Sequence, residues 1–340
     1  MKKIRFGKTG LMVSEVGFGA IPIQRLSVED AVVLMRGCFD LGVNFIDTAN
    51  GYGDSEEKIG RAICEVPRHE LVIATKSGAR DKQGLLEHLD LSLKRMGTDY
   101  IDVYQHHGIS SEDTWSQICA PGGALEGMEA AVKSGKVRFP AFSSHSIPMA
   151  IKLMKTEKFY ATQLPINFID DEAAAEAIPL ARALDIGFIA MKPFGGGLLH
   201  DARLSMKYLA QFEGIVPDPG IEKLSEMQEI IRIVEAREPL TEADQAAMQE
   251  TKKDLGSTWC HRCEYCQPCP KNIALSLVLN VESIIKRMPK HKVLDFMGQN
   301  MQLAKQCTNC QACISRCPYN LNIPKLLTEK TNAWDQYIKD

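Results

Sequence analysis

The chain has 340 residues, of which 45% are hydrophobic, and a formal net charge of −3 at pH 7. This length suits an α/β barrel with an additional domain, and the apolar fraction supports a large core. The small net charge gives no reason to expect a nucleic-acid or membrane-surface partner. The longest apolar runs are too short to cross a bilayer, and no apolar export signal follows Met1-Lys2-Lys3, so we expect a cytoplasmic protein.

Short apolar runs alternate with amphipathic stretches along the first 240 residues. Two brief extended segments, Ile4–Phe6 and Met12–Val13, come before this alternation. The strands that the alternation predicts are Val16–Ala20, Val43–Asp47, Leu71–Thr75, Ile101–Tyr104, Val137–Ser143, Thr162–Ile166, Ile186–Met191 and Gly214–Pro217. The stretches between them have helical spacing, as in Ser27–Leu41, where Ser27 and Asp30 form a variant capping box. Eight strands, each followed by a helix, predict an α/β fold of the (β/α)8 or TIM-barrel type.

The pattern changes near residue 240. One helix is predicted to begin at Thr241, and further helical patterns cover Ala274–Lys286 and Lys292–Lys305. We therefore expect a barrel over residues 1–240 and a mainly helical domain over residues 241–340.

Eight of the eleven cysteines lie in two tight runs within this second part. The runs are Cys260, Cys263, Cys266, Cys269, followed by Pro270, and Cys307, Cys310, Cys313, Cys317, followed by Pro318. The second run has the C-x2-C-x2-C-x3-C-P spacing of bacterial ferredoxins, in which three thiolates bind one cluster and the fourth binds the other. Two such runs predict a ferredoxin-like domain with two 4Fe–4S clusters and crossed ligands. One cluster would take Cys260, Cys263, Cys266 and Cys317, and the other Cys307, Cys310, Cys313 and Cys269.

Two other interpretations of the cysteines fit less well. A zinc site uses two separated pairs or a Cys/His mixture to close one tetrahedron, whereas these runs offer eight thiols at near-constant spacing. A disulfide framework is typical of short secreted chains. Only two residues separate Cys266 from Cys269, where the ferredoxin spacing has three, so the fate of Cys269 stays open.

Four reactive side chains follow the ends of predicted barrel strands. Asp47 ends the second strand, Tyr52 lies in the loop after it, Lys76 ends the third strand, and His107 ends the fourth. Catalytic groups of such barrels come from the carboxyl ends of strands. We therefore expect an acid, a phenol, an amine and an imidazole to meet at one mouth of the barrel.

The segments around these residues resemble the aldo-keto reductase family. The similar segments are RFGKTGLMVSEVGFG, FIDTANGYG, VIATKSG and DYIDVYQHHG, in the order and spacing of the family. With its cysteine runs, the whole chain resembles the branch of this family that carries a C-terminal dicluster domain. The resemblance implies reversible reduction of a small aldehyde or ketone to an alcohol by NAD or NADP in its reduced form. It also assigns the family's histidine to His107, with His106 facing outward.

The chemistry of carbonyl reduction suits the same four residues. The reaction needs a hydride on carbon and a proton on oxygen. A phenol has an unperturbed pKa of about 10, and a nearby ammonium lowers it by stabilising the phenolate. Tyr52 would then donate the proton, Lys76 would supply the charge, and Asp47 would hold Lys76 in place. His107 would orient the carbonyl oxygen through a hydrogen bond.

The resemblance also implies cofactor contacts further around the barrel. Ser143, Ser144 and Gln163 would hold the nicotinamide carboxamide, although a serine turn and an ordinary polar strand residue are the simpler alternatives. Backbone amides of Gly195 and Gly196 would approach a pyrophosphate, with charge from Lys192, unless the glycines form a plain hinge. Glu226 falls where the family has a basic group for the adenosine 2′-phosphate, so NADH is at least as suitable as NADPH.

Three functions are consistent with the sequence. In the first, the barrel is a carbonyl reductase and the clusters are structural or sense redox state. In the second, the clusters exchange electrons with a ferredoxin-like partner. Hydride transfer moves two electrons and a 4Fe–4S centre takes one, so that coupling normally needs a flavin, for which the sequence has no fingerprint. In the third, the barrel is a non-catalytic scaffold, which the intact set of four reactive residues argues against.

Overall fold

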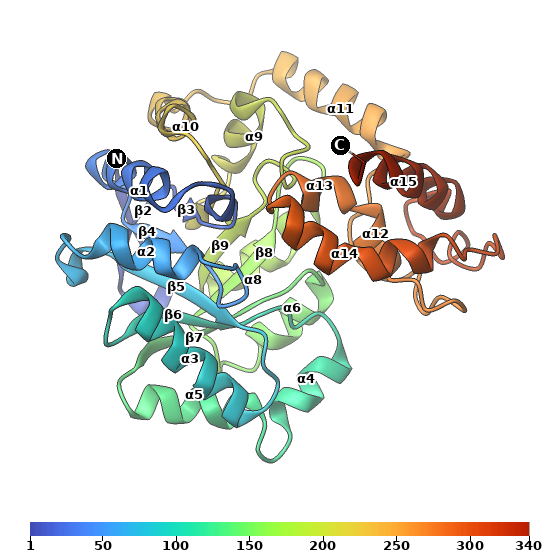
Figure 1. Cartoon of the computed structure of the whole chain (residues 1–340). Coiled ribbons are helices and arrows are strands. Elements are labelled where there is room, and N and C mark those ends of the chain that lie inside the picture. Colours follow the sequence, from blue (N-terminus) through green and yellow to red (C-terminus); the bar gives the residue numbers. More distant parts are fainter. Residues whose placement is uncertain (340) are drawn as a thin grey trace. The chain divides into compact units, whose positions relative to one another are not determined.

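The computed structural model describes residues 1–339, which divide into two compact units (Figure 1). Unit 1 comprises Met1–Gly195 and Leu199–Pro239. Unit 2 comprises Gly196–Leu198 and the chain from Leu240 onward.

Unit 1 begins with a short antiparallel hairpin. Strands β1 (Lys3–Arg5) and β2 (Met12–Ser14) pair with Ile4 opposite Val13. Phe6 follows β1 and packs against Phe45, with 5.4 Å between the ring centroids. Phe6 and Val13 belong to the apolar cluster that fills the barrel lumen. The hairpin thus contributes to the core of the barrel.

Eight parallel strands follow, and they pair in chain order. They are β3 (Phe18–Gly19), β4 (Phe45–Asp47), β5 (Val72–Ser77), β6 (Ile101–His106), β7 (Val137–Ser143), β8 (Ala161–Pro165), β9 (Gly187–Met191) and β10 (Ile215–Pro217). The first and last strands meet through two backbone bonds, Gly17 N to Pro217 O at 2.8 Å and Gly19 N to Pro219 O at 2.9 Å. A parallel bridge joins Gly19 to Gly220 at the same seam. The structure confirms the predicted (β/α)8 barrel.

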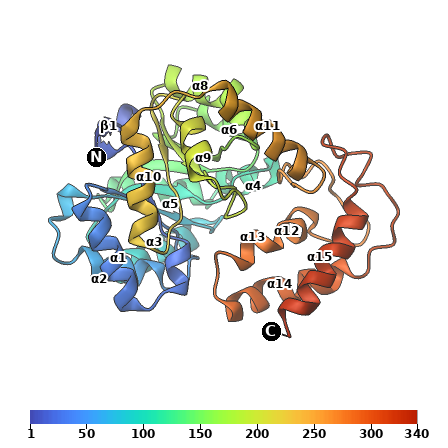
Figure 2. The same ribbon diagram turned by 90° about the horizontal axis from the view of Figure 1, so that it is seen from above.

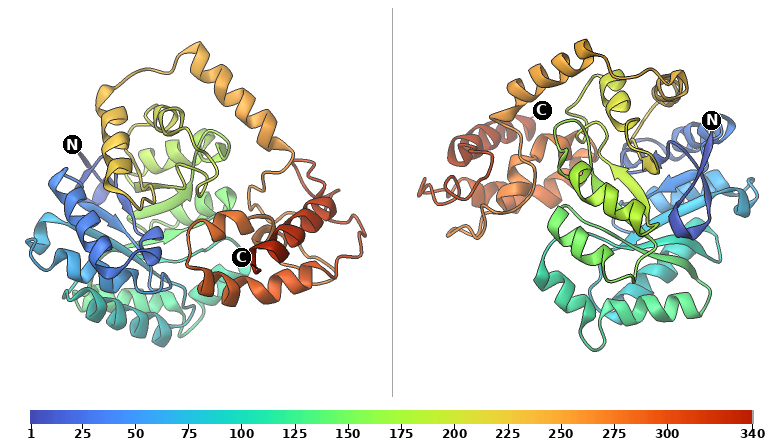
Figure 3. Two further views of the ribbon diagram at one scale, coloured as in Figure 1. Left: turned by 45° about the horizontal axis from the view of Figure 1, so that its top comes forward. Right: turned by 180° about the vertical axis from the view of Figure 1, so that it is seen from behind.

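Helices surround these strands (Figure 3). They are α1 (Val28–Asp40), α2 (Ser55–Ile63), α3 (Lys82–Met96), α4 (Glu112–Cys119), α5 (Ala124–Lys133), α6 (Ile147–Met154), α7 (Glu172–Ala175), α8 (Ala177–Ala183), α9 (Ala202–Leu209) and α10 (Leu224–Ala236). Helix α1 begins as predicted, because the Ser27 hydroxyl accepts from Asp30 N at 3.0 Å. A large buried apolar cluster fills the space between the helices and the outer faces of the strands.

All regular secondary structure in the described residues of unit 2 is helical, and these residues contain no β-strand. Its helices are α11 (Glu242–Gly256), α12 (Leu275–Leu279), α13 (Val281–Ile285), α14 (Lys290–Ala304) and α15 (Ile323–Tyr337). Helices α12, α14 and α15 pack together around buried Val278, Met297 and Trp334 (Figure 2). The two cysteine runs occupy irregular segments, one between α11 and α12 and the other between α14 and α15. The helices thus hold two loops that carry the thiols.

Residues 1–339 lack two features. None of the described helices combines the length and the apolar character needed to span a membrane. Within the same residues, no three His, Cys, Asp or Glu side chains lie close enough together to hold a single metal ion.

Candidate functional site

The lumen of the barrel changes from apolar to polar toward the carboxyl ends of its strands. Phe45, Ala74, Val103, Ala161 and Val216 belong to the apolar lumen cluster. Two residues further along each strand, and thus on the same face, stand Asp47, Lys76, Gln105, Gln163 and Asp218, all buried. The period of two along each strand therefore places a polar layer directly above the apolar core.

Lys76 and Asp47 form an ion pair inside this layer. Lys76 Nζ donates to Asp47 Oδ2 at 2.6 Å and to the carbonyl oxygen of Thr48 at 2.6 Å. Burial opposes the charge on Lys76, but the nearby Asp47 carboxylate raises the pKa of this lysine. Gln105 Nε2 donates to the other carboxylate oxygen of Asp47 at 3.1 Å. A buried ion pair is stable only when its remaining hydrogen bonds are satisfied, and this pair has those partners.

Tyr52 lies in the loop between β4 and α2. Its backbone is held by a turn in which Tyr52 N donates to Ala49 O at 2.9 Å. The Nζ of Lys76 lies 5.3 Å from the centroid of the Tyr52 ring. The ring of His107 meets the Tyr52 ring edge-on, with 5.9 Å between centroids. The structure thus brings together the four residues that the sequence placed at one mouth.

His107 follows the last residue of β6. The backbone N–H of His107 donates to Ser77 O at 2.9 Å, and Arg80 Nη2 donates to the backbone carbonyl oxygen of His107 at 2.8 Å. Burial, together with the positive charges of Lys76, Arg80 and Lys192, lowers the pKa of His107 to about 3. Its imidazole is therefore neutral near pH 7 and can donate a hydrogen bond without carrying charge.

His106 lies on the opposite face of β6. It is fully buried, and its ring meets Phe159 edge-on at 6.1 Å between centroids. Phe159 belongs to the cluster between strands and helices. His106 therefore faces outward, as the alternation of the strand predicts.

Two residues of the polar layer were not predicted as site residues. Asp218 follows β10 and accepts from Gln163 Nε2 at 2.7 Å. Burial, and then the neighbouring carboxylate of Asp47, raise the pKa of Asp218 well above its usual value. The second missed residue is Gln105. Period-two alternation from the apolar lumen residues was the signal that could have found Gln105, which lies within β6.

Gln163 occupies the centre of this layer. Its Nε2 donates to Asp47 Oδ2 at 2.9 Å as well as to Asp218. Its buried Oε1 has no hydrogen-bond partner within the described part of the chain. A buried amide oxygen without a partner is unfavourable, so this atom is suited to accept from a ligand N–H.

The two predicted serines make local contacts. Ser143 Oγ accepts from Gly108 N at 2.9 Å and so supports the loop directly after His107. Ser144 Oγ accepts from Ser146 N at 3.0 Å, which is a turn at the start of α6. These bonds use part of the capacity of each hydroxyl, which has one donor and two acceptor positions.

The remaining predicted cofactor residues lie in three settings. Lys192 has a left-handed backbone with φ of 61°, and its Nζ lies beside Nε2 of His145. Gly195 N closes a turn onto Lys192 O at 2.9 Å. In unit 2, the Gly196 carbonyl accepts from the Ser283 hydroxyl at 3.1 Å.

Glu226 lies in the first turn of α10. Its Oε2 accepts from Glu222 N at 2.8 Å and from Lys223 N at 3.1 Å. These bonds cap the amino end of the helix, a role that favours an acidic side chain whatever binds nearby.

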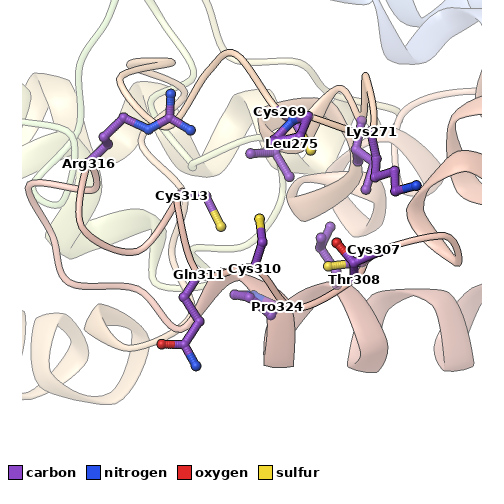
Figure 4. A pocket seen from close by; sticks show the side chains of 13 residues that line it. Cys269, Lys271, Leu275, Cys307, Thr308, Cys310, Gln311, Cys313, Arg316 and Pro324 are labelled. Carbon is purple, nitrogen blue, oxygen red and sulfur yellow. The ribbon is translucent and has the colours of Figure 1, made fainter.

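In unit 2, four thiols from both cysteine runs line one cavity. Figure 4 shows Cys307, Cys310 and Cys313 of the second run facing it together with Cys269 of the first. Burial raises the pKa of the Cys313 thiol, and its neighbours Cys307, Cys310 and Cys269 add to the shift. This is the set that the crossed ligand pattern assigns to one cluster.

The other four thiols also lie near one another. Burial raises the pKa of Cys266 to about 12, and Cys260, Cys263 and Cys317 add to the shift. Three of these residues belong to the first run and Cys317 to the second. A 4Fe–4S cluster is much larger than one ion, so its thiolates are spaced further apart than the ligands of a single metal. Both sets of four thiols fit the all-cysteine ligation of such clusters.

Two family models match the chain. The aldo/keto reductase family matches residues 15–234, and the 4Fe-4S dicluster domain matches residues 259–322. Among curated proteins, the uncharacterized oxidoreductase YqkF of Bacillus subtilis is 27% identical over 309 residues, with 75% of this chain and 98% of that protein covered. L-galactose dehydrogenase of Arabidopsis thaliana is 29% identical over 212 residues, with 57% of this chain and 65% of that protein covered.

Solved structures share the fold. The aldo-keto reductase AKR11C1 from Bacillus halodurans in its holo form has a TM-score of 0.64 at 23% identity, with 74% of this chain and 96% of that chain covered. An aldo-keto reductase from Klebsiella pneumoniae in complex with NADPH has a TM-score of 0.63 at 20% identity, with 74% and 94% covered. At these identities the likeness concerns the architecture of the barrel.

Proposed function

The chain belongs to the aldo/keto reductase family, and from that premise we propose that its barrel reversibly reduces a small aldehyde or ketone with NADH or NADPH. The observation that carries this proposal is the convergence of Asp47, Lys76, Tyr52 and His107 at one end of the barrel. Carbonyl reduction requires a proton on the carbonyl oxygen. Together these groups can deliver that proton and stabilise the anion that remains on the proton donor.

When bound, the nicotinamide supplies the hydride in reduction and accepts it in oxidation. In the direction of reduction, the Tyr52 hydroxyl gives its proton to the carbonyl oxygen. The ammonium of Lys76, 5.3 Å from the Tyr52 ring centroid, stabilises the phenolate that remains. Asp47 holds this ammonium through its 2.6 Å hydrogen bond. The neutral imidazole of His107 orients the carbonyl oxygen, and solvent returns the proton to Tyr52.

For the cofactor we propose the residues that the family resemblance assigns, namely Ser143, Ser144, Gln163, Lys192, Gly195, Gly196 and Glu226. The buried, unpartnered Oε1 of Gln163 supports this assignment, because a nicotinamide carboxamide offers an N–H donor. The related Klebsiella enzyme, which was solved with NADPH, gives a precedent for a nicotinamide cofactor in this fold.

For the mainly helical domain over residues 241–340, we propose two 4Fe–4S clusters. Cys260, Cys263, Cys266 and Cys317 would bind one cluster, and Cys269, Cys307, Cys310 and Cys313 the other. The match to a dicluster domain and the two groups of thiols support this count. Such clusters persist in a reducing compartment, which agrees with the expected cytoplasmic location.

Electron exchange with a ferredoxin-like partner is the second candidate function. It is favoured by the exposure of Cys310, one of the thiols around the cavity in unit 2. A cluster bound there would lie near the surface of the unit, where a partner could exchange electrons with it.

Two measurements test the proposed function. Tyr52→Phe should lower carbonyl reduction by about 100-fold or more, because the proton donor is lost. Cofactor binding and iron content should be unchanged, and wild-type activity in this variant would contradict the proposal.

Anaerobic titration of flavin-free protein with NADH and then NADPH tests the second candidate. Reduced-cluster EPR signals would show that electrons pass from the nicotinamide to the iron.

A further inference from the structure

Arg316 links the two cysteine runs through hydrogen bonds that each end on the backbone. It is half-buried and directly precedes Cys317 in the second run. Its Nη1 donates to Gln267 O at 2.9 Å and its Nη2 to Pro268 O at 3.0 Å. Gln267 and Pro268 are the two residues between Cys266 and Cys269. The Arg316 guanidinium therefore binds the segment in which the first run is one residue shorter than the ferredoxin spacing.

The guanidinium is itself oriented from within the second run. Arg316 Nε donates to Ala312 O at 2.9 Å, one turn earlier in the loop. Ala312 lies between Cys310 and Cys313, so all three hydrogen bonds of Arg316 reach the backbone of a cysteine run. The planar guanidinium presents its donors in a fixed geometry, whereas a lysine ammonium acts as a single point charge.

The segment before Cys269 is also held by its own side chain. Gln267 Oε1 accepts from Cys269 N at 2.8 Å, and Gln267 Nε2 donates to Ile273 O at 2.9 Å. The position of Cys269 thus depends on Gln267 from within the first run and on Arg316 from the second. Figure 4 shows Arg316 and Cys269 among the residues that line the same cavity.

We propose that Arg316 is a positioning residue, which fixes Cys269 as the fourth ligand of the cluster held by Cys307, Cys310 and Cys313. It compensates for the shortened spacing by fastening the carbonyls before Cys269 to the second run. This inference rests on the proposed two-cluster function of the domain.

Arg316 also places a permanent positive charge in the cavity wall. The reduction potential of an iron–sulfur cluster depends on its net charge and surroundings. A cation beside the cluster stabilises the more negative, reduced form, so its loss lowers the potential. Lys271 lines the same cavity and provides a matched control for charge, because its replacement leaves the hydrogen bonds of Arg316 in place.

The test uses the full chain, reconstituted anaerobically, with iron and sulfide analysis and an EPR-monitored redox titration. The variants are Arg316→Met, Arg316→Lys, Cys269→Ser and Lys271→Met. Wild-type protein should bind about eight irons, the content of two 4Fe–4S clusters. Arg316→Met should lose about half of the iron and reproduce the single remaining EPR signal of Cys269→Ser. Lys271→Met should keep all the iron, with a lowered potential for one cluster only.

The outcomes separate this inference from the proposed function. Wild-type protein with fewer than two clusters would contradict the two-cluster function itself. Wild-type protein with two clusters, and Arg316→Met with the same iron content, would overturn the positioning role of Arg316 alone, whatever the potentials, because lost charge by itself lowers a potential. If Arg316→Met does not fold, Arg316→Lys decides the matter. It should show partial iron loss or a shifted potential in one cluster, and wild-type values there would equally overturn the inference.

Discussion

Asp47 and Asp218 share one hydrogen-bond donor, the amide nitrogen of Gln163, at 2.9 Å and 2.7 Å. Both carboxyls are buried in the barrel lumen, and Lys76 forms its ion pair with Asp47. Two adjacent buried carboxylates with one ammonium are not stable if both are ionised. Asp47 is the one paired with Lys76, so Asp218 is the group that the site keeps protonated.

We expect Asp218→Asn to stabilise the protein near neutral pH. Burial and the neighbouring Asp47 raise the pKa of Asp218 well above its usual value. An unfolded aspartate ionises near pH 4, so above that pH the folded chain holds a proton that the unfolded chain has released. The stability linked to this group is fully present below the unfolded pKa and is lost as pH rises toward the folded pKa. The loss amounts to about 1.4 kcal/mol per pH unit.

Thermal or urea unfolding of Asp218→Asn from pH 4 to pH 8 checks the direction in which the free energy of unfolding changes with pH. The variant keeps a neutral group that can accept from Gln163, so its advantage over wild type should be absent near pH 4 and grow with pH. Asp40→Asn is the control, since Asp40 is exposed at the end of α1. A variant that is less stable than wild type at every pH would show that Asp218 is ionised in the folded chain.

The ion pair gives a second prediction, which separates stability from activity. Lys76→Met leaves the Asp47 carboxylate buried without its cation, so we expect a loss of about 3–5 kcal/mol in the free energy of unfolding. Carbonyl reduction should fall by about 100-fold or more, because the phenolate of Tyr52 loses its stabilising charge.

The double variant Asp47→Asn with Lys76→Met completes this test. It removes both charges, so unfolding free energy should recover by several kcal/mol relative to Lys76→Met. Activity should stay low, since the ammonium is still missing. Recovery of both quantities together would mean that Lys76 acts only through the stability of the barrel.

Much of the architecture could be predicted because it depends on local patterns. Each barrel strand is an apolar run, and the reactive residues at their ends converge once the strands are parallel and in order. Asp47, Lys76 and His107 could be predicted as site residues in this way. Asp218 was not, because β10 is three residues long and ends in Pro217, so the sequence does not show where its lumen face continues.

Tertiary contacts account for another difference between the predicted and the observed structure. The predicted helix Ala274–Lys286 is interrupted at Asn280 and forms α12 and α13 instead. Asn280 Nδ2 donates to Ser276 O at 2.8 Å and to Cys260 O at 3.4 Å. The second bond reaches the first cysteine run, which is a contact that helical periodicity cannot reveal.

Closure of the barrel gives a third prediction. A Cβ added to Gly19 would lie 2.5 Å from Asp218 O and 3.0 Å from Pro219 O, both in the backbone directly after β10, the strand that closes the sheet. Backbone atoms there cannot move without breaking the Gly19–Pro219 hydrogen bond. We expect Gly19→Ala to lower the free energy of unfolding by about 1–3 kcal/mol. Gly78→Ala is the matched control, because nothing lies within 4 Å of its added Cβ.

The neutral state of His107 gives the last prediction. Burial and the charges of Lys76, Arg80 and Lys192 lower the pKa of His107 to about 3, so this imidazole should not titrate between pH 5 and pH 8. NMR of ring-labelled protein should show a His107 resonance that is constant over this range. His107→Gln retains a neutral donor and should keep more carbonyl-reductase activity than His107→Leu. A His107 signal that moves with a midpoint near 6.5, the unperturbed value, would mean that the imidazole carries charge at the site.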